Sequence, residues 1–228
     1  MARKKRNQFD VDEIYRGLRT NIEFSQMDDA IQVINVVSTI PNEGKSTVVF
    51  NLCKALAEDG KRVILLDADL RKSVLYNRCM PNQEVKGLSH YLAGFVPLND
   101  VICKTNIKNL YMAFAGLNAP NPAELLGNPK FKAAIEAMKK SFNYIIVDCA
   151  PIGAVIDAAV VAKSVDGMVM VIEQKKVSRR MAQKMKEQLE ASGCPLLGVV
   201  LNKVKISENK SYGGYGQYYG HYGKYGEY

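Results

Sequence analysis

One short polar segment, residues 39–47, constrains the fold of this chain more than any other. It follows an apolar run at residues 31–37, which is typical of a buried strand, and it precedes a helical stripe of apolar residues that ends near Glu58. Where a strand, a glycine-containing loop and a helix follow one another, backbone N–H groups and the helix N-terminus converge on an anion. The segment therefore predicts a phosphate-binding loop in an α/β fold.

The loop matches the pattern G-x-x-x-x-G-K-[ST], except that Thr39 replaces the first glycine. Lys45 is expected to reach the β- and γ-phosphates of a nucleoside triphosphate, Ser46 to ligate Mg²⁺, and Gly44 to let the backbone approach without a Cβ. The alternative is a helix start with an incidental Gly-Lys pair, which the flanking strand and helix disfavour. The residues expected to bind the nucleotide are Pro41, Asn42, Glu43, Gly44, Lys45, Ser46 and Thr47.

Two further apolar runs end in aspartate. Residues 63–66 are followed by Asp67 and Asp69, and residues 144–147 are followed by Asp148. Buried strands of a parallel sheet are apolar throughout, and ligands bind at their carboxyl ends. If the extended geometry continues, Asp67 and Asp69 point to the same side, and two carboxylates beside a triphosphate repel it unless a divalent cation lies between them. The aspartates therefore predict bound Mg²⁺, with Asp148 as a Walker B residue.

Residues 165–172 and 195–202 are expected to form two more buried strands, and the second ends at Asn202. The amide of this residue has a donor and an acceptor, so it is suited to reading an adenine edge, but an ordinary turn asparagine fits equally well. Together the elements predict an α/β, P-loop NTPase-like single domain with a doubly wound, mostly parallel sheet flanked by helices. Residues 73–108 contain a short helix at 88–93 and receive no functional role.

The first helix is expected over residues 10–25. Its apolar side consists of Val11, Ile14, Leu18 and Ile22. Glu13 and Arg16 are three residues apart and are therefore neighbours on another side. A charged side of this kind usually only solvates a helix, but it is also suited to docking a second subunit.

The composition is that of a soluble globular protein, with 228 residues of which 47% are hydrophobic and 24% charged. This length suits one α/β domain with short extensions. No apolar run approaches the ~20 residues that span a bilayer, and no signal-peptide core follows the N-terminus, so we expect a cytoplasmic protein. Five scattered cysteines without a C-x-x-C spacing predict reduced thiols, and the two histidines disfavour a histidine-based site.

The net charge of +8 would suit nucleic acid or an anionic membrane surface. However, the only dense basic run is residues 3–6, and the remaining charge is spread evenly without the aromatic residues of a single-strand binding groove. We therefore expect no nucleic-acid partner. We interpret the charge as a solvated surface, with weak attraction to acidic lipids or partners as the alternative.

The composition changes abruptly at Ser211, after which glycine and tyrosine dominate and no aliphatic residue occurs. Such a segment cannot bury a core, so we expect a flexible tail. Beside an ATP site its accessible phenols are suited to accept phosphoryl groups, whereas the alternative is a sticky or partner-binding low-complexity segment. The tail tyrosines are Tyr212, Tyr215, Tyr218, Tyr219, Tyr222, Tyr225 and Tyr228.

Together these motifs resemble the bacterial tyrosine kinases (the BY-kinase family) that govern capsular and exopolysaccharide synthesis. Residues 41–47 resemble the family's Walker A motif, residues 63–71 its Walker A′ motif with an Asp-x-Asp-x-Arg ending, and residues 144–151 its Walker B motif. Residues 121–126 and the tyrosine tail are also similar to the family. Nearly the whole chain takes part in the resemblance.

The N-terminal helix contributes to the same resemblance. Glu13, Arg16 and Arg19 match a family motif that lies at a ring-forming subunit interface. Two positions depart from the family pattern: Ser73 stands where proline is common, and the pair Cys149-Ala150 follows the Walker B aspartate. Neither departure affects a group that must bind Mg²⁺ or phosphate.

The resemblance implies roles for the site residues. Lys45 binds the phosphates, Ser46 and Asp69 lie close to Mg²⁺ with Asp148 behind them, and Asp67 is the base that takes the tyrosine proton. A phenol with a pKa of about 10 is mostly protonated at neutral pH, so a carboxylate that accepts this proton is chemically reasonable. Lys45, Asp67 and Asp69 are thus the expected catalytic residues.

The resemblance also implies cofactors, partners and an organisation of the chain. The expected cofactors are ATP and Mg²⁺. The expected partners are other copies in a ring-shaped homo-oligomer, a membrane-anchored activator of the polysaccharide co-polymerase type that recruits the kinase to the inner face of the plasma membrane, and a cognate tyrosine phosphatase. Residues 1–30 would form a basic arm and oligomerisation helix, residues 31–205 the ATP-binding kinase domain, and residues 206–228 the tail.

Two rival hypotheses come from other functional classes. Partition- or division-site-type ATPases share the fold but carry a signature lysine five residues before the loop lysine, where this chain has Ile40, and they lack a tyrosine tail. Alternatively, the tail is an interaction module and the core a degenerate ATP-binding domain. The intact set of Lys45, Asp67, Asp69 and Asp148 argues against this second alternative.

Overall fold

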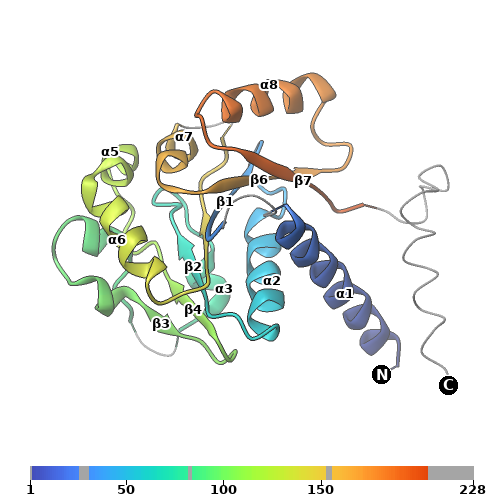
Figure 1. Ribbon diagram of the computed structural model, residues 1–228, viewed down its shortest axis with the longest axis horizontal. Helices are drawn as coiled ribbons and strands as arrows, with labels where there is room; N and C mark the ends of the chain where they lie inside the picture. The colour runs from blue at the N-terminus through green and yellow to red at the C-terminus, as the bar shows by residue number, and fades with distance from the viewer. Residues whose placement is uncertain (1, 26–30, 82–83, 153–155, 205–228) are drawn as a thin grey trace.

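The structure, a computed structural model, describes residues 2–25, 31–81, 84–152 and 156–204, and for residues 2–10 it describes the backbone alone. Within these ranges seven strands form one sheet in the order β3-β4-β2-β5-β1-β6-β7 (Figure 1). Every neighbouring pair is parallel except β3 and β4. The strands are β1 (Val33–Ser38), β2 (Val63–Asp67), β3 (Cys103–Lys104), β4 (Leu110–Ala113), β5 (Tyr144–Asp148), β6 (Gly167–Glu173) and β7 (Leu196–Asn202). The predicted fold class, a mostly parallel doubly wound sheet flanked by helices, is confirmed.

Helices cover both faces of this sheet (Figure 1). They are α1 (Ala2–Phe24), α2 (Lys45–Glu58), α3 (Leu75–Cys79), α4 (Leu88–Leu92), α5 (Pro122–Gly127), α6 (Pro129–Lys139), α7 (Asp157–Val161) and α8 (Arg179–Glu190), with 3-10 turns at Leu98–Val101 and Ala162–Ser164. In the part of the chain that is described, no helix is both long and apolar enough to cross a membrane.

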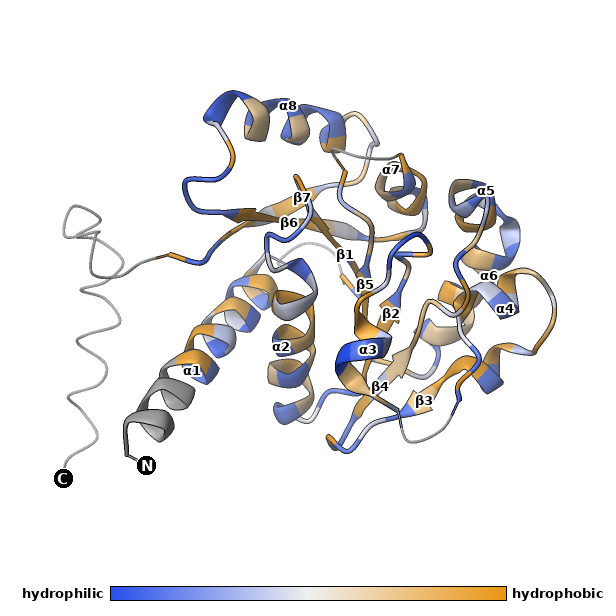
Figure 2. Cartoon of the chain, turned by 180° about the vertical axis from the view of Figure 1, so that it is seen from behind, coloured by the Kyte–Doolittle hydropathy of each residue, from blue (hydrophilic) through white to orange (hydrophobic). Residues whose placement is uncertain are grey.

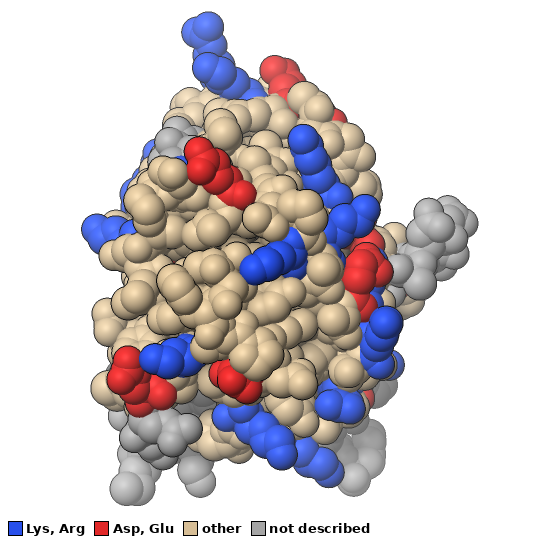
Figure 3. Space-filling view, turned by 90° about the vertical axis from the view of Figure 1, so that its left-hand side faces the viewer, with Lys and Arg blue, Asp and Glu red and all other residues tan. Residues whose placement is uncertain are grey.

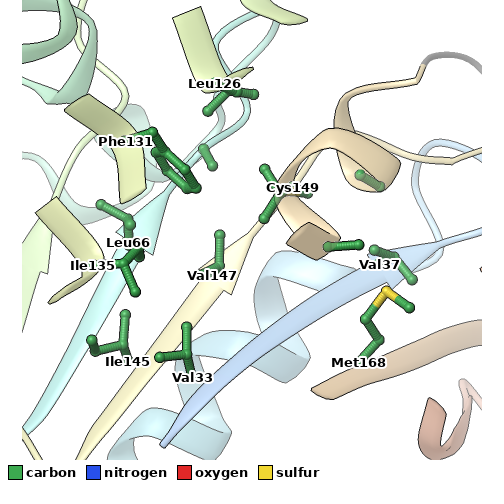
Figure 4. Close-up of a cluster of buried hydrophobic side chains, with 14 of the residues drawn as sticks. Val33, Val37, Leu66, Leu126, Phe131, Ile135, Ile145, Val147, Cys149 and Met168 are labelled. Atoms are coloured by element: carbon green, nitrogen blue, oxygen red, sulfur yellow. The ribbon is translucent and has the colours of Figure 1, made fainter. Parts of the chain in front are cut away.

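The strict alternation of side chains along the central strands creates two cores. Val33 and Val37 of β1 face a cluster that includes Phe131 and Ile135 of α6, as Figure 4 shows. Ile34 and Val36 of β1 face the opposite cluster, to which α1 and α2 contribute. Because both faces are covered, these strands are apolar throughout, which is why they stand out in the sequence and as orange segments in Figure 2.

The predicted strands and main helices are found with shifted ends. One expectation was wrong: the strand over residues 195–202 is not buried, because β7 lies at the edge of the sheet and exposes about half of Val199 and Leu201. The first helix begins at Ala2 rather than at residue 10, because the basic residues that precede the apolar stripe are themselves good helix formers. In the region without an assigned role, residues 73–108, the short helix expected at residues 88–93 is found as α4. Helix α3 and strand β3, with lengths of five and two residues, are too short to show a period and were not predicted. All seven tail tyrosines lie outside the described residues.

Candidate active site

The phosphate loop connects β1 to α2 at the carboxyl edge of the sheet. Gly44 adopts a left-handed conformation with a φ of 86°, and its carbonyl accepts the N–H groups of Thr47 and Val48 at 3.0 Å to start the helix. A Cβ on Gly44 would lie 2.3 Å from the amide nitrogen of Asn202, so both the backbone angle and the space require glycine here. The loop therefore has the open N-terminal geometry that binds anions.

The side chain of Glu43 turns inward and is fully buried. One carboxylate oxygen accepts hydrogen bonds from the backbone N–H and the hydroxyl of Thr39, both at 2.7 Å, and from the N–H of Ile40 at 2.9 Å. The other oxygen accepts the N–H of Glu173 on β6 at 2.9 Å. The sequence predicted Glu43 as a nucleotide contact, but its carboxylate is committed to holding the loop in shape, so a ligand contact is left to its backbone.

The end of β7 clamps the loop from the other side. The amide of Asn202 donates to the carbonyl of Glu43 at 2.7 Å. Lys203 donates from Nζ to the carbonyl of Asn42 at 2.8 Å and forms an ion pair with Glu173 at 2.9 Å. Asn202 thus lies at the phosphate loop, with its donor bound to the loop backbone, and its predicted role in reading adenine stays a prediction.

Lys45 and Asp148 form a buried ion pair, in which Nζ donates to Oδ1. Their side chains are only 8% and 2% exposed. The two residues are 103 positions apart in the chain and meet because β5 lies beside β1. From the sequence, Lys45 was expected to bind phosphate and Asp148 to bind Mg²⁺. In the structure these two side chains contact each other.

Asp67 lies directly opposite Asp148 in the β2–β5 register and is fully buried. Burial first, and then the negative charge of Asp148, raise the pKa of Asp67 from its ordinary value of 3.8 to about 7, although a hydrogen bond from Ser73 and the charge of Lys45 act in the opposite direction. The Ser73 hydroxyl donates to Oδ2, and the N–H of Asp69 donates to Oδ1 at 3.2 Å. A carboxylate with this pKa is suited to exchange a proton near neutral pH.

Asp69 is half-buried in the turn that follows β2. Its Oδ1 accepts the N–H groups of Arg71 at 3.3 Å and Lys72 at 3.0 Å, so the side chain shapes the turn. The turn is fixed to α7 because Arg71 donates from Nε and a terminal nitrogen to the two oxygens of Asp157 at 2.7 and 2.9 Å. The sequence analysis did not identify Asp157. The signal that could have found it is an acidic residue between apolar neighbours.

The donor set fits a divalent cation of the magnesium type. Two buried carboxylates, Asp67 and Asp148, stand side by side with Lys45 as their neighbouring cation, and Ser46 is half-buried in the first turn of α2. In the described ranges no group of three His, Cys, Asp or Glu side chains is gathered into a complete metal cage. Mg²⁺ is usually held by one or two carboxylates together with waters and substrate phosphates, and Asp67 and Asp148 are carboxylates of this kind.

The three residues predicted for a subunit interface have different surroundings. Glu13 and Arg16 are about half exposed and pair with each other at 3.3 Å on the surface of α1. Arg19 is 19% exposed and instead holds α1 onto the end of α2, donating to the carbonyl of Ala55 at 3.2 Å and pairing with Asp59 at 3.1 Å. The structure therefore gives Arg19 an intramolecular contact, and the interface role of the three residues stays a prediction.

The surface carries both signs of charge. On the face shown in Figure 3, lysine and arginine side chains alternate with aspartate and glutamate rather than forming one basic stripe. This distribution agrees with the interpretation of the net charge as a solvated surface on that face.

Comparison with known proteins identifies the fold family. The family described as "AAA domain" matches residues 31–191. Tyrosine-protein kinase CpsD of Streptococcus agalactiae is 41% identical over 197 residues, which cover 86% of this chain and 85% of that protein. Tyrosine-protein kinase YwqD of Bacillus subtilis is 37% identical over 201 residues, covering 88% and 84%.

Solved structures agree with this result. The chimerical protein CapA2B2 superposes with a TM-score of 0.80 at 35% identity, covering 84% of each chain. The septum site-determining protein MinD of Pyrococcus horikoshii, complexed with Mg-ADP, gives a TM-score of 0.67 at 28% identity and covers 78% of this chain and 72% of that chain. The nucleotide-binding fold, the phosphate loop and the kinase relatives lead to one conclusion: the chain belongs to the bacterial tyrosine kinase (BY-kinase) family and is a protein-tyrosine kinase.

Proposed function

We propose that this kinase uses ATP and Mg²⁺ to phosphorylate the tyrosine cluster of its own C-terminal tail, in trans within an oligomer, and that it thereby regulates capsule or exopolysaccharide biosynthesis. The observation that carries the proposal is the meeting of Lys45, Asp67 and Asp148 beside the phosphate loop. A cation and two buried carboxylates at a helix N-terminus are the groups that phosphoryl transfer from a nucleotide needs.

The phosphate loop would hold the nucleotide. The N-terminus of α2 attracts the phosphates, and Lys45 would neutralise the β- and γ-phosphates after leaving or sharing its ion pair with Asp148. The remaining predicted contacts come from the backbone of residues 41–44 and from Ser46 and Thr47. Asn202, whose amide donates to the carbonyl of Glu43, would contact the nucleotide from the end of β7.

Magnesium would be held by Ser46 and Asp69, with Asp148 behind them. When bound, Mg²⁺ would supply positive charge that neutralises the charge developing on the phosphates during transfer. The chain's own carboxylates then have separate tasks. Asp69 shapes the turn after β2, and Asp148 orients Lys45.

Asp67 would accept the proton of the attacking tyrosine. Its raised pKa of about 7 makes it a stronger base than an ordinary carboxylate while it remains largely ionised just above neutral pH. The hydroxyl of Ser73 and the N–H of Asp69 fix both carboxylate oxygens. A phenol aligned on this carboxylate needs no other base.

The tail is long enough to reach an active site. Its roughly 24 residues after Val204 span at most about 80 Å when extended and about 25–30 Å as a glycine-rich coil. Full phosphorylation of the seven tyrosines would add about −10 to −14 charges, which reverses the net charge of +8. We expect the modified tail to be expelled and the oligomer to loosen, which sizing before and after incubation with Mg-ATP will test; an oligomer of unchanged size after full modification argues against this step.

The partners follow from the same proposal. The exposed pair Glu13–Arg16 on α1, together with Arg19, would contribute to a ring-shaped homo-oligomer. A membrane-anchored activator of the polysaccharide co-polymerase type would recruit the cytoplasmic kinase to the inner face of the plasma membrane. A cognate tyrosine phosphatase would reset the tail. The chain has the three parts predicted above, with residues 31–205 as the kinase domain.

The rival function is an ATPase switch without kinase activity. MinD shares the fold, which is why the fold alone does not decide between the two functions. The position of the signature lysine of such ATPases is occupied by Ile40, whose N–H binds Glu43 at 2.9 Å. The kinase relatives and the tyrosine tail favour the autokinase.

One experiment separates the two functions. The purified protein is incubated with Mg-ATP, alone and with the activator, and phosphotyrosine is measured by mass spectrometry. We expect phosphotyrosine in the wild type and in the control variant Lys132→Met, which changes an exposed lysine, but not in Lys45→Met or in a chain truncated after Lys210. Nucleotide hydrolysis without phosphotyrosine, even with the activator, would favour the switch.

The same variants decide between cis and trans transfer. Full-length Lys45→Met offers a tail without activity, and the truncated chain offers activity without a tail. When the two are mixed, transfer in trans predicts phosphotyrosine on the Lys45→Met chain. An unlabelled Lys45→Met chain beside an active wild type would show that transfer occurs in cis.

A further inference from the structure

Helix α3 connects the two halves of the active site. At its start the Ser73 hydroxyl donates to Asp67 and accepts the N–H of Leu75 at 3.3 Å. At its end Arg78 donates from a terminal nitrogen to the hydroxyl of Thr47 at 3.1 Å. Because Thr47 lies in the first turn of α2, this bond brings a guanidinium to the rim of the phosphate loop.

This position is electrostatically unfavourable for an unpaired cation. The N-terminus of a helix carries a positive partial charge, which disfavours a cation beside it, and the exposed Arg78 side chain is nevertheless held there by Thr47. Within the part of the chain that the structure describes, no carboxylate pairs with Arg78. By contrast, Arg71 on the preceding turn forms a bidentate pair with Asp157. A cation held at an anion-binding helix end without an anionic partner suits a ligand that brings the negative charge.

The alternative is a surface arginine whose contact with Thr47 serves packing alone. A guanidinium has five donors in a planar fork, and the contact with Thr47 uses one of them. The remaining donors match the oxygens of a phosphate, which a guanidinium binds in bidentate fashion. The Thr47 hydroxyl accepts from Arg78, so its own hydrogen remains free to point at the same phosphate.

We propose that Arg78 is a second phosphate-binding cation of this active site, which contacts the nucleotide phosphate that lies beside Thr47 and that ADP and ATP share. The inference rests on the proposed function because it requires the nucleotide to bind at this loop. It adds a nucleotide contact from α3 to those of the phosphate loop. Since the same helix carries Ser73 at its start, nucleotide binding by Arg78 would also hold α3 against Asp67.

The test compares nucleotide affinities of Arg78→Gln, Arg78→Lys and a matched control, Arg180→Gln, which changes an exposed arginine on α8. Dissociation constants for ATP, ADP and adenosine are measured by titration, at low and high salt. A charge-assisted hydrogen bond contributes enough to expect about 10- to 100-fold weaker binding of both ATP and ADP to Arg78→Gln. Arg78→Lys should recover part of this loss, and adenosine, which has no phosphate, should bind all variants equally.

Salt dependence distinguishes a direct contact from a packing role. Loss of a phosphate contact should make ADP affinity in Arg78→Gln less sensitive to ionic strength than in the wild type. ATP and ADP affinities of Arg78→Gln within twofold of the wild type would overturn the inference, and so would an equal loss for adenosine, which would mean that the loop has moved. Failure of the wild type to bind ATP would instead contradict the proposed function.

Discussion

Two loops meet at the active site, and each contains a buried carboxylate. In the loop after β1, the carboxylate of Glu43 accepts four hydrogen bonds, from Thr39, Ile40 and Glu173. In the loop after β2, the carboxylate of Asp67 accepts two, and a second carboxylate lies opposite it. The two side chains are equally buried but differ in the number of hydrogen bonds that they accept.

The difference shows what decides the role of a buried acid. A carboxylate whose oxygens are occupied by hydrogen-bond donors, as those of Glu43 are, works as a structural brace. A carboxylate with few donors and a negative neighbour is destabilised in its charged form, and the pKa of Asp67 accordingly rises to about 7. Burial alone therefore does not distinguish the two roles, whereas the number of hydrogen-bond donors around the carboxylate does.

The loops also differ in how they are held. The first is braced internally by Glu43 and externally by the end of β7. The second depends on Arg71, which fixes the turn to Asp157 on α7, and on Ser73. We expect the first loop to be the more rigid of the two, and the second to be the more sensitive to single substitutions.

The largest expected effect concerns stability as a function of pH, measured by urea unfolding in EDTA without nucleotide. The pKa of Asp67 is raised in the folded state, so the folded protein keeps a proton that the unfolded chain has already released. The stability that this group contributes is therefore present below about pH 4 and is lost as the pH rises through about 7. Asp67→Asn removes this dependence and should exceed the wild type by about 2 to 4 kcal/mol at pH 8. The exposed Asp100→Asn is the control, and an Asp67→Asn variant less stable than the wild type at pH 8 would contradict the assignment.

The next effect tests the external support of the second loop. Arg71→Met leaves the fully buried Asp157 without its partner. Because Arg71 itself is partly exposed, we expect a loss of about 2 to 4 kcal/mol in the free energy of unfolding. Arg180→Met on α8 should change stability by less than about 0.5 kcal/mol.

A double variant shows whether this loss comes from the unpaired acid. Arg71→Met combined with Asp157→Asn should be more stable than Arg71→Met alone, because the uncompensated charge is gone. Equal or lower stability of the double variant would mean that the loss in Arg71→Met does not come from the unpaired charge of Asp157.

A somewhat smaller effect is expected in the first loop. Glu43→Ala leaves the donors of Thr39, Ile40 and Glu173 without an acceptor and should cost about 2 to 3 kcal/mol, or about 5 to 10 °C in melting temperature. Glu84→Ala, which removes a side chain that is 87% exposed, is the matched control. If Glu43→Ala melts with the wild type, then the carboxylate does not brace the loop.

The smallest effect sharpens the comparison within the second loop. The Ser73 hydrogen bond lowers the pKa of Asp67, so Ser73→Ala should raise this pKa further. The midpoint of the pH dependence of stability in EDTA should therefore move to higher pH, with a change in stability of about 1 kcal/mol. A midpoint that moves to lower pH would show that another group dominates the titration.

Much of this architecture could be predicted from the sequence, because its signals are local. The strands, the phosphate loop and the aspartates after residues 66 and 147 each occupy a continuous segment with its own pattern. Contacts between distant residues were not accessible: Glu43 binds Glu173 across 130 positions, and Arg71 binds Asp157 across 86. The inward turn of Glu43 therefore appears only in the folded chain, where β1 and β6 are neighbours.

The region between residues 73 and 108 shows a second limit. Although the short helix α4 was predicted there, α3 is only five residues long, so no helical period develops and it had no signature in the sequence. Helix α3 matters to the site because of its position: Ser73, just before the helix, binds Asp67, and Arg78, near its end, binds Thr47. No local pattern in the sequence predicts such a position in the folded chain.

The most direct test of the central claim is the rate of tail phosphorylation in the variant that carries both Asp67→Asn and Asp69→Asn. The initial rate of phosphotyrosine formation with saturating Mg-ATP is compared with the wild type and with Asp100→Asn. If the carboxylates after β2 bind the metal and accept the tyrosine proton, the rate should fall by about 10³-fold or more. Labelling at the wild-type rate would contradict the assignment of this loop as the catalytic one.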